Sequence, residues 1–246
     1  MDNNEKQLNP EKPENPARPK PNMQRVGELM QAATRRMSMG ERFRFNLSTQ
    51  DAVDLLTGFY CAEIKARHRQ VKLDPKTVDN LVALAEFITD KAPKFGIMFC
   101  GPVGNGKTTL MKAFQRCVYY LDDGHHFSFL DDTVYSYRFK PEMIIVDVRE
   151  IIRTAREDAQ RFEYIKKYQM LGIDDLGKEP AEIMDYGNVL SPVIDLLEYR
   201  YDKQLFTIIT TNLVGKEIRE KYGERIADRF NEMLTQVVFK NPTYRL

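Results

Sequence analysis

Few cysteines, no long apolar run and almost no net charge limit what this 246-residue chain can be. Its three cysteines, Cys61, Cys100 and Cys117, are scattered, so the sequence indicates neither a disulfide framework nor a zinc cluster and fits a reducing compartment. No apolar run approaches the roughly 18 residues that a membrane span needs, and no signal peptide is visible. We therefore expect a soluble, cytoplasmic protein that has no membrane partner.

The balance of charge does not by itself indicate a nucleic-acid binder. Lysine and arginine number 37 and aspartate and glutamate 36, which gives a formal net charge of +1. A local basic patch could still bind a phosphate backbone. The basic residues Lys65, Arg67, His68, Arg69 and Lys72 follow a predicted helix, where they form either a solvated face or an electrostatic contact.

Composition divides the chain into three parts. Residues 1–24 are polar and hold five prolines, so we expect a disordered tail. Residues 25–74 have apolar side chains at helical spacing and are predicted to form an N-terminal helical region that binds a partner. Within it, arginines alternate with Met and Phe at 35–45; this segment either docks a protein or nucleic acid or packs on its own domain. Residues 75–246 are predicted to form an α/β domain.

In this α/β domain, short apolar runs alternate with helical patterns. The alternation is typical of a mostly parallel sheet with helices on both faces. We expect a β-hairpin insertion at 122–141, a mostly helical stretch at 183–201, and two short helices at 215–221 and 223–234.

The strongest motif is Gly-x-x-x-x-Gly-Lys-Thr at 101–108, the phosphate-binding loop pattern. A strand-like apolar run, 95–100, precedes it and a helical pattern follows it, which is the context that the motif requires. Glycines let backbone N–H groups surround an anion, and the helix start adds partial positive charge. Lys107 can then reach the β- and γ-phosphates of ATP; the alternative is a Gly-rich turn that binds nothing. The predicted nucleotide-binding residues are Gly101, Pro102, Val103, Gly104, Asn105, Gly106, Lys107, Thr108 and Thr109.

Acidic residues end the apolar run 170–173 and complete the predicted magnesium site. Asp174 stands at the carboxyl end of this predicted strand, where it would hold Mg²⁺ together with the Thr108 hydroxyl. Asp175 would polarise the attacking water. The predicted reaction is hydrolysis of ATP, which we expect to be slow or dependent on a partner because Asp is shorter than the Glu often found at this position.

Two further motifs follow. A strand pattern that ends in Thr-Thr-Asn presents Asn212, whose amide either faces the γ-phosphate and the attacking water or caps the next element. Arg225 and Arg229 are four residues apart and share a helical face. One of them could reach the γ-phosphate of a neighbouring subunit, or both could be surface residues paired with Glu224 or Asp228.

The order of these motifs, Gly-Pro-Val-Gly-Asn-Gly-Lys-Thr, Gly-Ile-Asp-Asp-Leu-Gly, Thr-Thr-Asn and Gly-Glu-Arg-Ile-Ala-Asp-Arg-Phe, resembles the DnaC/IstB-like branch of the AAA+ ATPases. The resemblance covers residues 75–246 and implies a P-loop AAA+ core, with five parallel strands in the order 5-1-4-3-2 flanked by helices. It implies an ATPase that uses Mg²⁺ and gives Asn212 the sensor-1 position. It makes Arg229 the first and Arg225 the second choice for an arginine finger. The short stretch after the last predicted strand leaves no second-sensor arginine to assign.

By this resemblance we expect a DnaC-type DNA replication factor that loads the replicative helicase and self-associates in its ATP state. The branch contacts DNA through the helix after the second strand, which here carries Arg149, Arg153 and Arg156, with Lys166 and Lys167 as weaker candidates. The DNA could be single-stranded or duplex. Two alternatives remain open, an IstB-like ATPase helper of a transposase and a nucleotide-regulated adaptor without a DNA role.

Overall fold

The structure, a computed structural model, describes a large part of the chain in separate stretches. These are residues 22–34, 43–90, 94–121, 127–128, 142–180, 183–185 and 188–244. Most of the predicted tail, 1–24, and most of the predicted hairpin insertion, 122–141, lie outside the described residues.

The chain separates into two units, Met1–Ser38 and Met39–Leu246. The described part of the first unit is helix α1 (Met23–Thr34), which begins two residues before the predicted helical region. Apolar side chains on this helix, among them Leu29 and Met30, are exposed. The second unit contains every other described element.

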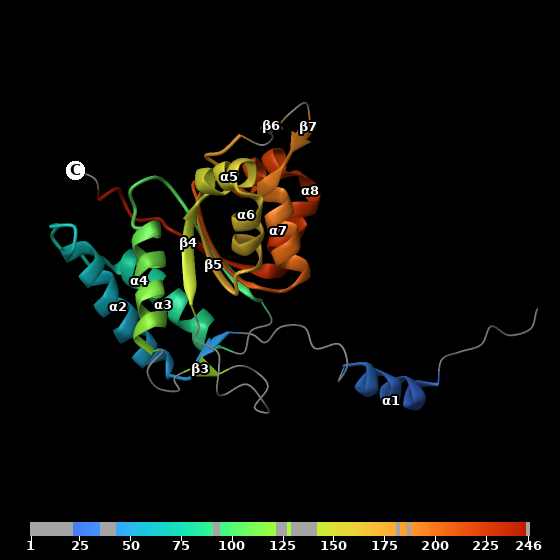
Figure 1. The fold of residues 1–246 in the computed structure, drawn as a ribbon. Helices are drawn as coiled ribbons and strands as arrows, with labels where there is room; N and C mark the ends of the chain where they lie inside the picture. Colours follow the sequence, from blue (N-terminus) through green and yellow to red (C-terminus); the bar gives the residue numbers. More distant parts are fainter. Residues whose placement is uncertain are drawn as a thin grey trace, which may run out of the picture. The chain divides into compact units, whose positions relative to one another are not determined.

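Five parallel strands form the central sheet of the second unit (Figure 1). From one edge to the other they are β4 (Met143–Asp147), β5 (Met170–Leu176), β8 (Phe206–Thr211), β2 (Gly96–Cys100) and β9 (Leu234–Val238). Counted among themselves along the chain, and taken from β9 to β4, these strands run in the order 5-1-4-3-2. In the labels of the whole chain the order differs, because short strands outside this sheet are numbered too. The short strands form two antiparallel pairs, β1 (Arg44–Phe45) with β3 (Phe127–Ser128) and β6 (Ile183–Asp185) with β7 (Asn188–Leu190).

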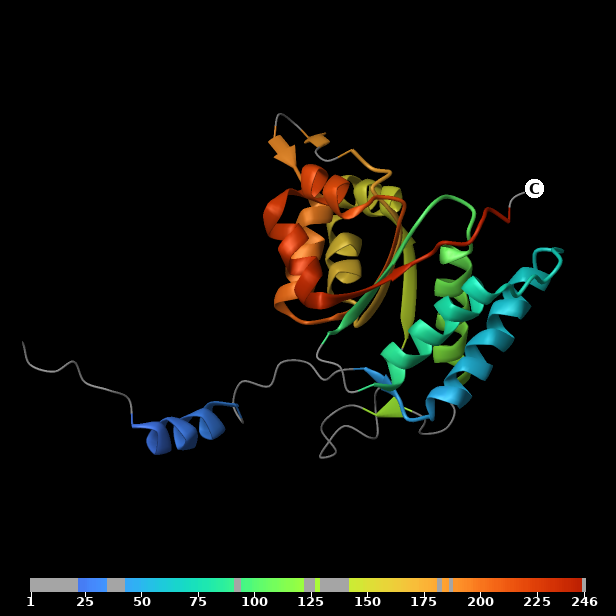
Figure 2. The ribbon, with the colours of Figure 1, turned by 180° about the vertical axis from the view of Figure 1, so that it is seen from behind.

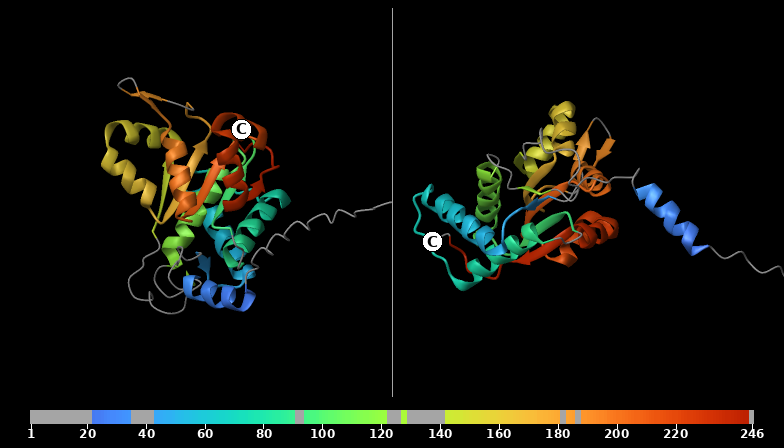
Figure 3. Two further views of the ribbon diagram at one scale, coloured as in Figure 1. Left: turned by 90° about the vertical axis from the view of Figure 1, so that its right-hand side faces the viewer. Right: turned by 90° about the horizontal axis from the view of Figure 1, so that it is seen from below.

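Helices cover both faces of the sheet, as the alternation of patterns predicts (Figures 1 and 2). One face carries α2 (Thr49–Lys65), α3 (Pro75–Thr89) and α4 (Lys107–Leu121). The other carries α5 (Val148–Glu157), α6 (Ala159–Lys167), α7 (Pro192–Asp202) and α8 (Gly215–Met233). The view from below in Figure 3 shows the same two helical layers. None of the helices in the described stretches is long and apolar enough to cross a membrane.

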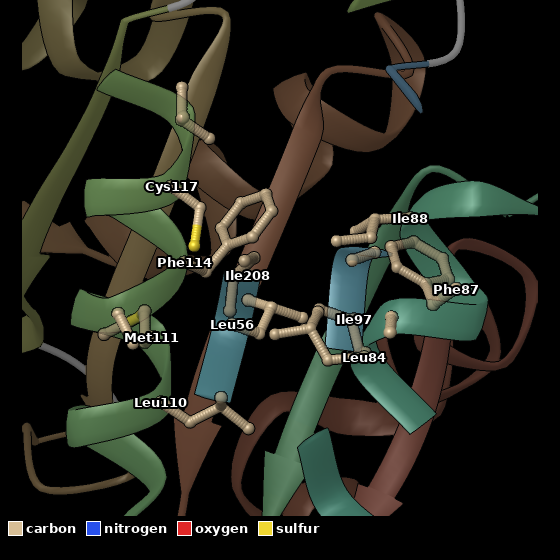
Figure 4. Close-up of a cluster of buried hydrophobic side chains, with 14 of the residues drawn as sticks. Leu56, Leu84, Phe87, Ile88, Ile97, Leu110, Met111, Phe114, Cys117 and Ile208 are labelled. Carbon is tan, nitrogen blue, oxygen red and sulfur yellow. The ribbon is translucent and has the colours of Figure 1, made fainter. Parts of the chain in front are cut away.

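Strand β2 buries different residues on its two faces because side chains alternate along a strand. Ile97 and Phe99 enter a hydrophobic cluster with α2, α3 and α4, whereas Met98 enters a second cluster with α5 to α8. Figure 4 shows Leu56 of α2 in the same cluster as Ile97 and Ile208. Helix α2 therefore belongs to the same unit as the sheet, whereas the predicted boundary between 74 and 75 separates α2 from α3.

The N-terminal part of this unit is fixed by two helix caps and two buried aromatic rings. The Ser48 hydroxyl accepts the N–H of Asp51 (3.1 Å) at the start of α2, and the Asp74 carboxylate caps α3 in the same way. Phe43 and Phe45 are buried against the core of the unit. The described end of the segment 35–45 thus packs on its own domain, which was one of its two interpretations.

The prediction of a mostly helical stretch at 183–201 is wrong in its first half. Strands β6 and β7 occupy 183–185 and 188–190, and α7 begins only at Pro192. A proline ring is tolerated in the first turn of a helix but clashes in its interior, so it starts a helix here instead of continuing one. The predicted break between 215–221 and 223–234 is confirmed, because Gly223 inside α8 has the non-helical angles φ 83° and ψ 164°.

Candidate functional site

The phosphate-loop motif forms a tight turn between strand β2 and helix α4. Gly101, Gly104 and Gly106 have positive φ angles of 144°, 86° and 95°, which L-residues with a side chain rarely adopt. A Cβ on Gly106 would lie 2.6 Å from the hydroxyl of Tyr60, so the loop also has no room for a larger residue there. The loop leads directly into the first turn of α4, where free N–H groups and the helix dipole favour an anion.

The Lys107 side chain folds back into this loop. Its ammonium donates hydrogen bonds to the carbonyls of Gly101 (2.6 Å) and Pro102 (2.8 Å) and to the side-chain oxygens of Asn105 (3.2 Å) and Asn212 (3.0 Å). All four acceptors are neutral. Burial lowers the pKa of Lys107 to about 8, because a charged group loses its hydration there. The site thus holds a buried cation that an anionic phosphate would stabilise.

Thr108 and Asp174, the two predicted magnesium ligands, lie together. The Thr108 hydroxyl donates to an Asp174 carboxylate oxygen at 2.8 Å, and the Thr210 hydroxyl donates to the same oxygen at 2.6 Å. In the described stretches no group of three or more His, Cys, Asp or Glu side chains could hold a metal without other ligands. The pair fits Mg²⁺, which is usually held by one or two protein oxygens together with water and substrate phosphates.

Asp175 is placed by an irregularity at the end of strand β5. The β5–β8 register shifts between Ile173 and Leu176, and Asp175 has a φ of 62°. Its backbone N–H donates to the Thr210 hydroxyl (2.8 Å), and its carboxylate forms an ion pair with Lys178. The bulge brings the Asp175 carboxylate to the same pocket as Asp174.

A pocket of about 550 Å³ opens over these groups. It is lined by most of the predicted residues, namely Val103, Gly104, Asn105, Gly106, Lys107, Thr108, Thr109, Asp174, Asp175 and Asn212. Its remaining wall was not predicted and consists of Tyr60, Ile64, Arg67, Arg69, Gln70, Lys72, Lys112, Lys178, Thr243 and Tyr244. The run of basic residues after α2 was visible in the sequence, but nothing local indicated that it faces the phosphate loop.

Comparison with known proteins identifies the fold. No protein-family model matches the sequence, and no curated protein matches it. The chain is similar to the crystal structure of the DnaC helicase loader, with 21% identity and a TM-score of 0.52 over 74% of this chain and 99% of that chain. It is also similar to the crystal structure of DnaI, with 20% identity and a TM-score of 0.50 over 72% of this chain and 88% of that one. The chain has a DnaC/IstB-like AAA+ fold.

The segment after β9, described to residue 244, packs against the phosphate loop of this AAA+ fold. The N–H of Tyr244 donates to the Gly104 carbonyl (2.9 Å), and the Asn241 amide donates to the Asn105 carbonyl (2.8 Å). The Tyr244 hydroxyl in turn contacts the carboxylate of Asp74, the cap of α3. The segment after β9 therefore ties the loop to the N-terminal helices of the same unit.

Neither arginine of the predicted finger pair lines the AAA+ pocket of its own chain. Arg229 pairs with Glu198 (3.1 Å) and Asp202 (3.4 Å) on α7, and its guanidinium stacks 4.7 Å from the centre of the Tyr201 ring. Arg225 pairs with the same Glu198 at 3.1 Å. Their carboxylate partners are thus on another helix and are not the predicted Glu224 and Asp228. The Arg225 side chain is 71% exposed, whereas that of Arg229 is 14% exposed.

The three arginines predicted to contact DNA lie on the outer side of α5. Arg149 forms an ion pair with Asp147 (2.9 Å), and Arg153 pairs with Glu150. Arg149, Arg153 and Arg156 are all exposed. Lys166 is different, because its side chain is only 11% exposed and is held by Glu163 and Asp195. Lys166 is therefore not available as a DNA contact, which corrects its place among the weaker candidates.

Proposed function

We propose that this chain is an ATP-dependent DNA replication factor of the DnaC type, which binds ATP with Mg²⁺, hydrolyses it, and delivers the replicative helicase to DNA in the cytoplasm. One observation carries the proposal. Lys107 and Thr108, Asp174, and Asn212 come from three distant parts of the sequence and meet at one pocket, in a chain whose similarity to the DnaC helicase loader structure covers 99% of that structure.

The phosphate loop supplies the groups that bind the phosphates. The N–H groups of 104–109 and the Lys107 ammonium would hold the β- and γ-phosphates, and the Thr108 and Asp174 oxygens would hold Mg²⁺. The metal, when bound, would neutralise charge that develops on the phosphate oxygens. Thr108 and Asp174 are hydrogen-bonded to each other in this structure. That hydrogen bond would have to break before both oxygens could bind the metal.

Two residues are placed to act on the attacking water and on the γ-phosphate. Asp175 would orient the water once its ion pair with Lys178 opens. Asn212 now accepts a hydrogen bond from Lys107. When Lys107 turns to a phosphate, the Asn212 amide loses that donor and becomes free to contact the γ-phosphate and the water. We therefore propose that Asn212 acts as the sensor of the bound nucleotide.

The partner contacts are proposed from the remaining surfaces. Residues 25–74 would contribute to the helicase contact, and the exposed apolar side chains of α1 offer a face for it. Self-association in the ATP state would bring an arginine of one subunit, Arg229 or Arg225, to the γ-phosphate of the next. The exposed arginines of α5 would contact the backbone of single-stranded or duplex DNA.

Native mass spectrometry of the full chain mixed with the replicative helicase of its host, with ATP and without, tests the proposal. We expect a defined complex that is lost when residues 1–38, the first unit, are deleted, because this deletion leaves α2 and the core of the second unit in place. A chain without 1–22 serves as the control, because it keeps α1 and all later elements. If no complex forms under either condition, the helicase-loader function is wrong, and a transposase becomes the next partner to test.

The arginine finger gives a prediction with its own control. We expect Arg229→Ala to bind ATP within about threefold of wild type but to hydrolyse it at least about 1,000-fold more slowly, since an arginine finger contributes about 10³–10⁵-fold in GTPases. Arg225→Ala is the matched variant, because both residues pair with Glu198. Normal turnover by pure Arg229→Ala protein would exclude Arg229, and a loss of turnover confined to Arg225→Ala would reassign the finger to Arg225.

DNA binding through α5 is testable by its salt dependence. Replacing Arg149, Arg153 and Arg156 with glutamine should weaken DNA binding and reduce the magnitude of the negative slope of log K against log salt by about 2 to 3, because fewer counterions are released. Fluorescence anisotropy with a labelled oligonucleotide at several salt concentrations measures both. Lys216→Gln, an exposed site on α8, is the control. An unchanged affinity and slope in the triple variant would remove α5 from the DNA interface.

A further inference from the structure

The nucleotide pocket has a wall that comes from the N-terminal part of the unit. Tyr60 and Ile64 belong to α2, and Arg67, Arg69 and Lys72 follow it within a few residues. His68 has a φ of 55°, which turns the chain just after α2. The whole lining contains six lysines and arginines but only two carboxylates, Asp174 and Asp175, so the pocket is strongly positive in a chain of net charge +1. A polyanion such as a nucleoside polyphosphate fits this charge.

Arg67 is the basic residue of this wall that is bonded to the start of the helix after the phosphate loop. Its guanidinium donates a hydrogen bond to the hydroxyl of Thr109 at 3.1 Å. Thr109 follows Thr108 directly in the first turn of α4, where N–H groups point at the pocket. Arg67 thus presents a cation beside the helix start at which phosphates bind.

A buried carboxylate holds Arg67 in place. Glu63, whose side chain is 6% exposed, accepts from Arg67 at 3.3 Å through one oxygen and from Arg116 through the other. Arg116 lies on α4 and is not among the pocket-lining residues. The two arginines therefore share one partner, but only Arg67 reaches the pocket.

The guanidinium of Arg67 has N–H groups that could still bind a ligand. It carries five N–H groups, of which the hydrogen bonds to Thr109 and Glu63 use two. Its side chain is 36% exposed and faces the pocket. Arginine binds phosphate oxygens through its planar fork, and such charge-assisted bonds are about twice as strong as neutral ones.

We infer that Arg67 binds the α- or β-phosphate of the nucleotide and so couples helix α2 to the occupancy of the site. The inference rests on the proposed nucleotide-binding function and adds a phosphate contact from outside the phosphate loop. A bound phosphate would draw Arg67, and with it the end of α2, against α4. Because α2 lies within the region 25–74 proposed to contact the helicase, this contact is a direct physical route from nucleotide to partner.

Isothermal titration calorimetry on the full chain tests this with Arg67→Gln and the matched control Arg116→Gln. The titrants are MgATP, MgADP and adenosine at one ionic strength. We expect Arg67→Gln to weaken the binding of MgATP and of MgADP by roughly 10- to 50-fold, which corresponds to the loss of one or two charge-assisted hydrogen bonds. Adenosine, which has no phosphate, should bind the variant as it binds wild type. Arg116→Gln should stay within about threefold of wild type for every titrant.

Hydrogen exchange of the α2 amides gives a second readout. ATP should slow their exchange in wild type and in Arg116→Gln, but not in Arg67→Gln at saturating nucleotide. Equal weakening in the two variants would overturn the inference, because the effect would then come from loss of a Glu63 partner. Unchanged nucleotide affinity in Arg67→Gln would overturn it as well. If wild type itself bound no nucleotide, the proposed function would fail first, and that result differs from either of these.

Discussion

Replacing Lys107 with alanine is expected to weaken ATP and ADP binding by at least about 100-fold, measured by calorimetry in the presence of Mg²⁺. The ammonium now lies within the loop and is held by four neutral oxygens. A phosphate offers charged oxygens in their place, and each charge-assisted bond contributes about 1.5–3 kcal/mol. Two such bonds lost at the same site correspond to roughly a 100-fold change or more.

The same substitution should leave the fold intact, which separates a binding defect from unfolding. Burial lowers the pKa of Lys107 to about 8, so at neutral pH the folded protein keeps an ammonium that has lost its hydration. Alanine removes the cost of burying a charge, which stabilises the fold. It also removes the four hydrogen bonds, which destabilises the fold, so the two effects oppose each other. We expect the free energy of unfolding without nucleotide to change by less than about 1 kcal/mol.

Lys216→Ala is the control for this experiment, because Lys216 is 84% exposed on α8 and does not line the pocket. It should bind nucleotide as wild type does. If Lys107→Ala protein bound ATP with wild-type affinity, the pocket would not be a phosphate site of this kind, and the proposed function would lose its main support.

The parts of the site that could be predicted are those whose functional residues lie next to one another in the sequence. The loop 101–108 contains its glycines, its cation and its hydroxyl in one run, so its structure follows from local sequence. Asp174 and Asn212 are far from the loop in sequence, but each comes at the end of an apolar run that predicts a strand. Because the carboxyl ends of parallel strands lie along one edge of a sheet, these residues could be expected to meet the loop.

The wall of the pocket that was not predicted contains no motif of adjacent functional residues in the sequence. Tyr60 and Arg67 look like ordinary residues at the end of an amphipathic helix, and their position depends on how α2 packs between α3 and α4. Tyr244 lies at the loop, where Asn241, Asp74 and Thr77 hold the segment after β9. These contacts connect residues from 42 positions apart, for Arg67 and Thr109, to 170 positions apart, for Tyr244 and Asp74, and no local pattern specifies them.

The hairpin β6–β7 was missed for a related reason. Its strands span only 183–185 and 188–190, too few residues to show an alternation of period two. The apolar residues of this stretch were therefore predicted as part of the helix that follows. The pairing of Arg229 with Glu198 and Asp202 was equally hidden, because it depends on the contact between α7 and α8.

Arg200→Leu is expected to destabilise the protein by about 3–5 kcal/mol, the largest effect on stability of any substitution proposed here. Arg200 is fully buried on α7 and its guanidinium binds only neutral oxygens. These are the hydroxyl of Thr207 and the carbonyls of Lys166, Tyr168, Gln169 and Phe206. Leucine is apolar and cannot replace these five hydrogen bonds, and a buried acceptor left unpaired costs about 1–3 kcal/mol.

Burying the charged guanidinium of Arg200 itself destabilises the fold, and leucine removes that penalty. We expect the gain to be smaller than the loss of the five hydrogen bonds. Burial lowers the pKa of Arg200 to about 9, which is still above neutral, so the surrounding oxygens retain the charged form. Urea unfolding without nucleotide measures the difference, and a fall in melting temperature of roughly 10 °C should accompany it. Arg156→Leu, at an exposed site on α5, should change the free energy of unfolding by less than about 0.5 kcal/mol.

The position of Arg200 also predicts what the substitution should spare. Its guanidinium joins the chain before β5 to the start of β8, where Met170 and Phe206 are paired. Asp174 and Asn212 follow at the opposite, carboxyl ends of the same two strands. Below its unfolding transition, Arg200→Leu protein should therefore bind ATP within a few-fold of wild type. Wild-type stability in this variant would show that the five acceptors find other donors, and a selective loss of ATP binding would show that Arg200 sets the register of the site.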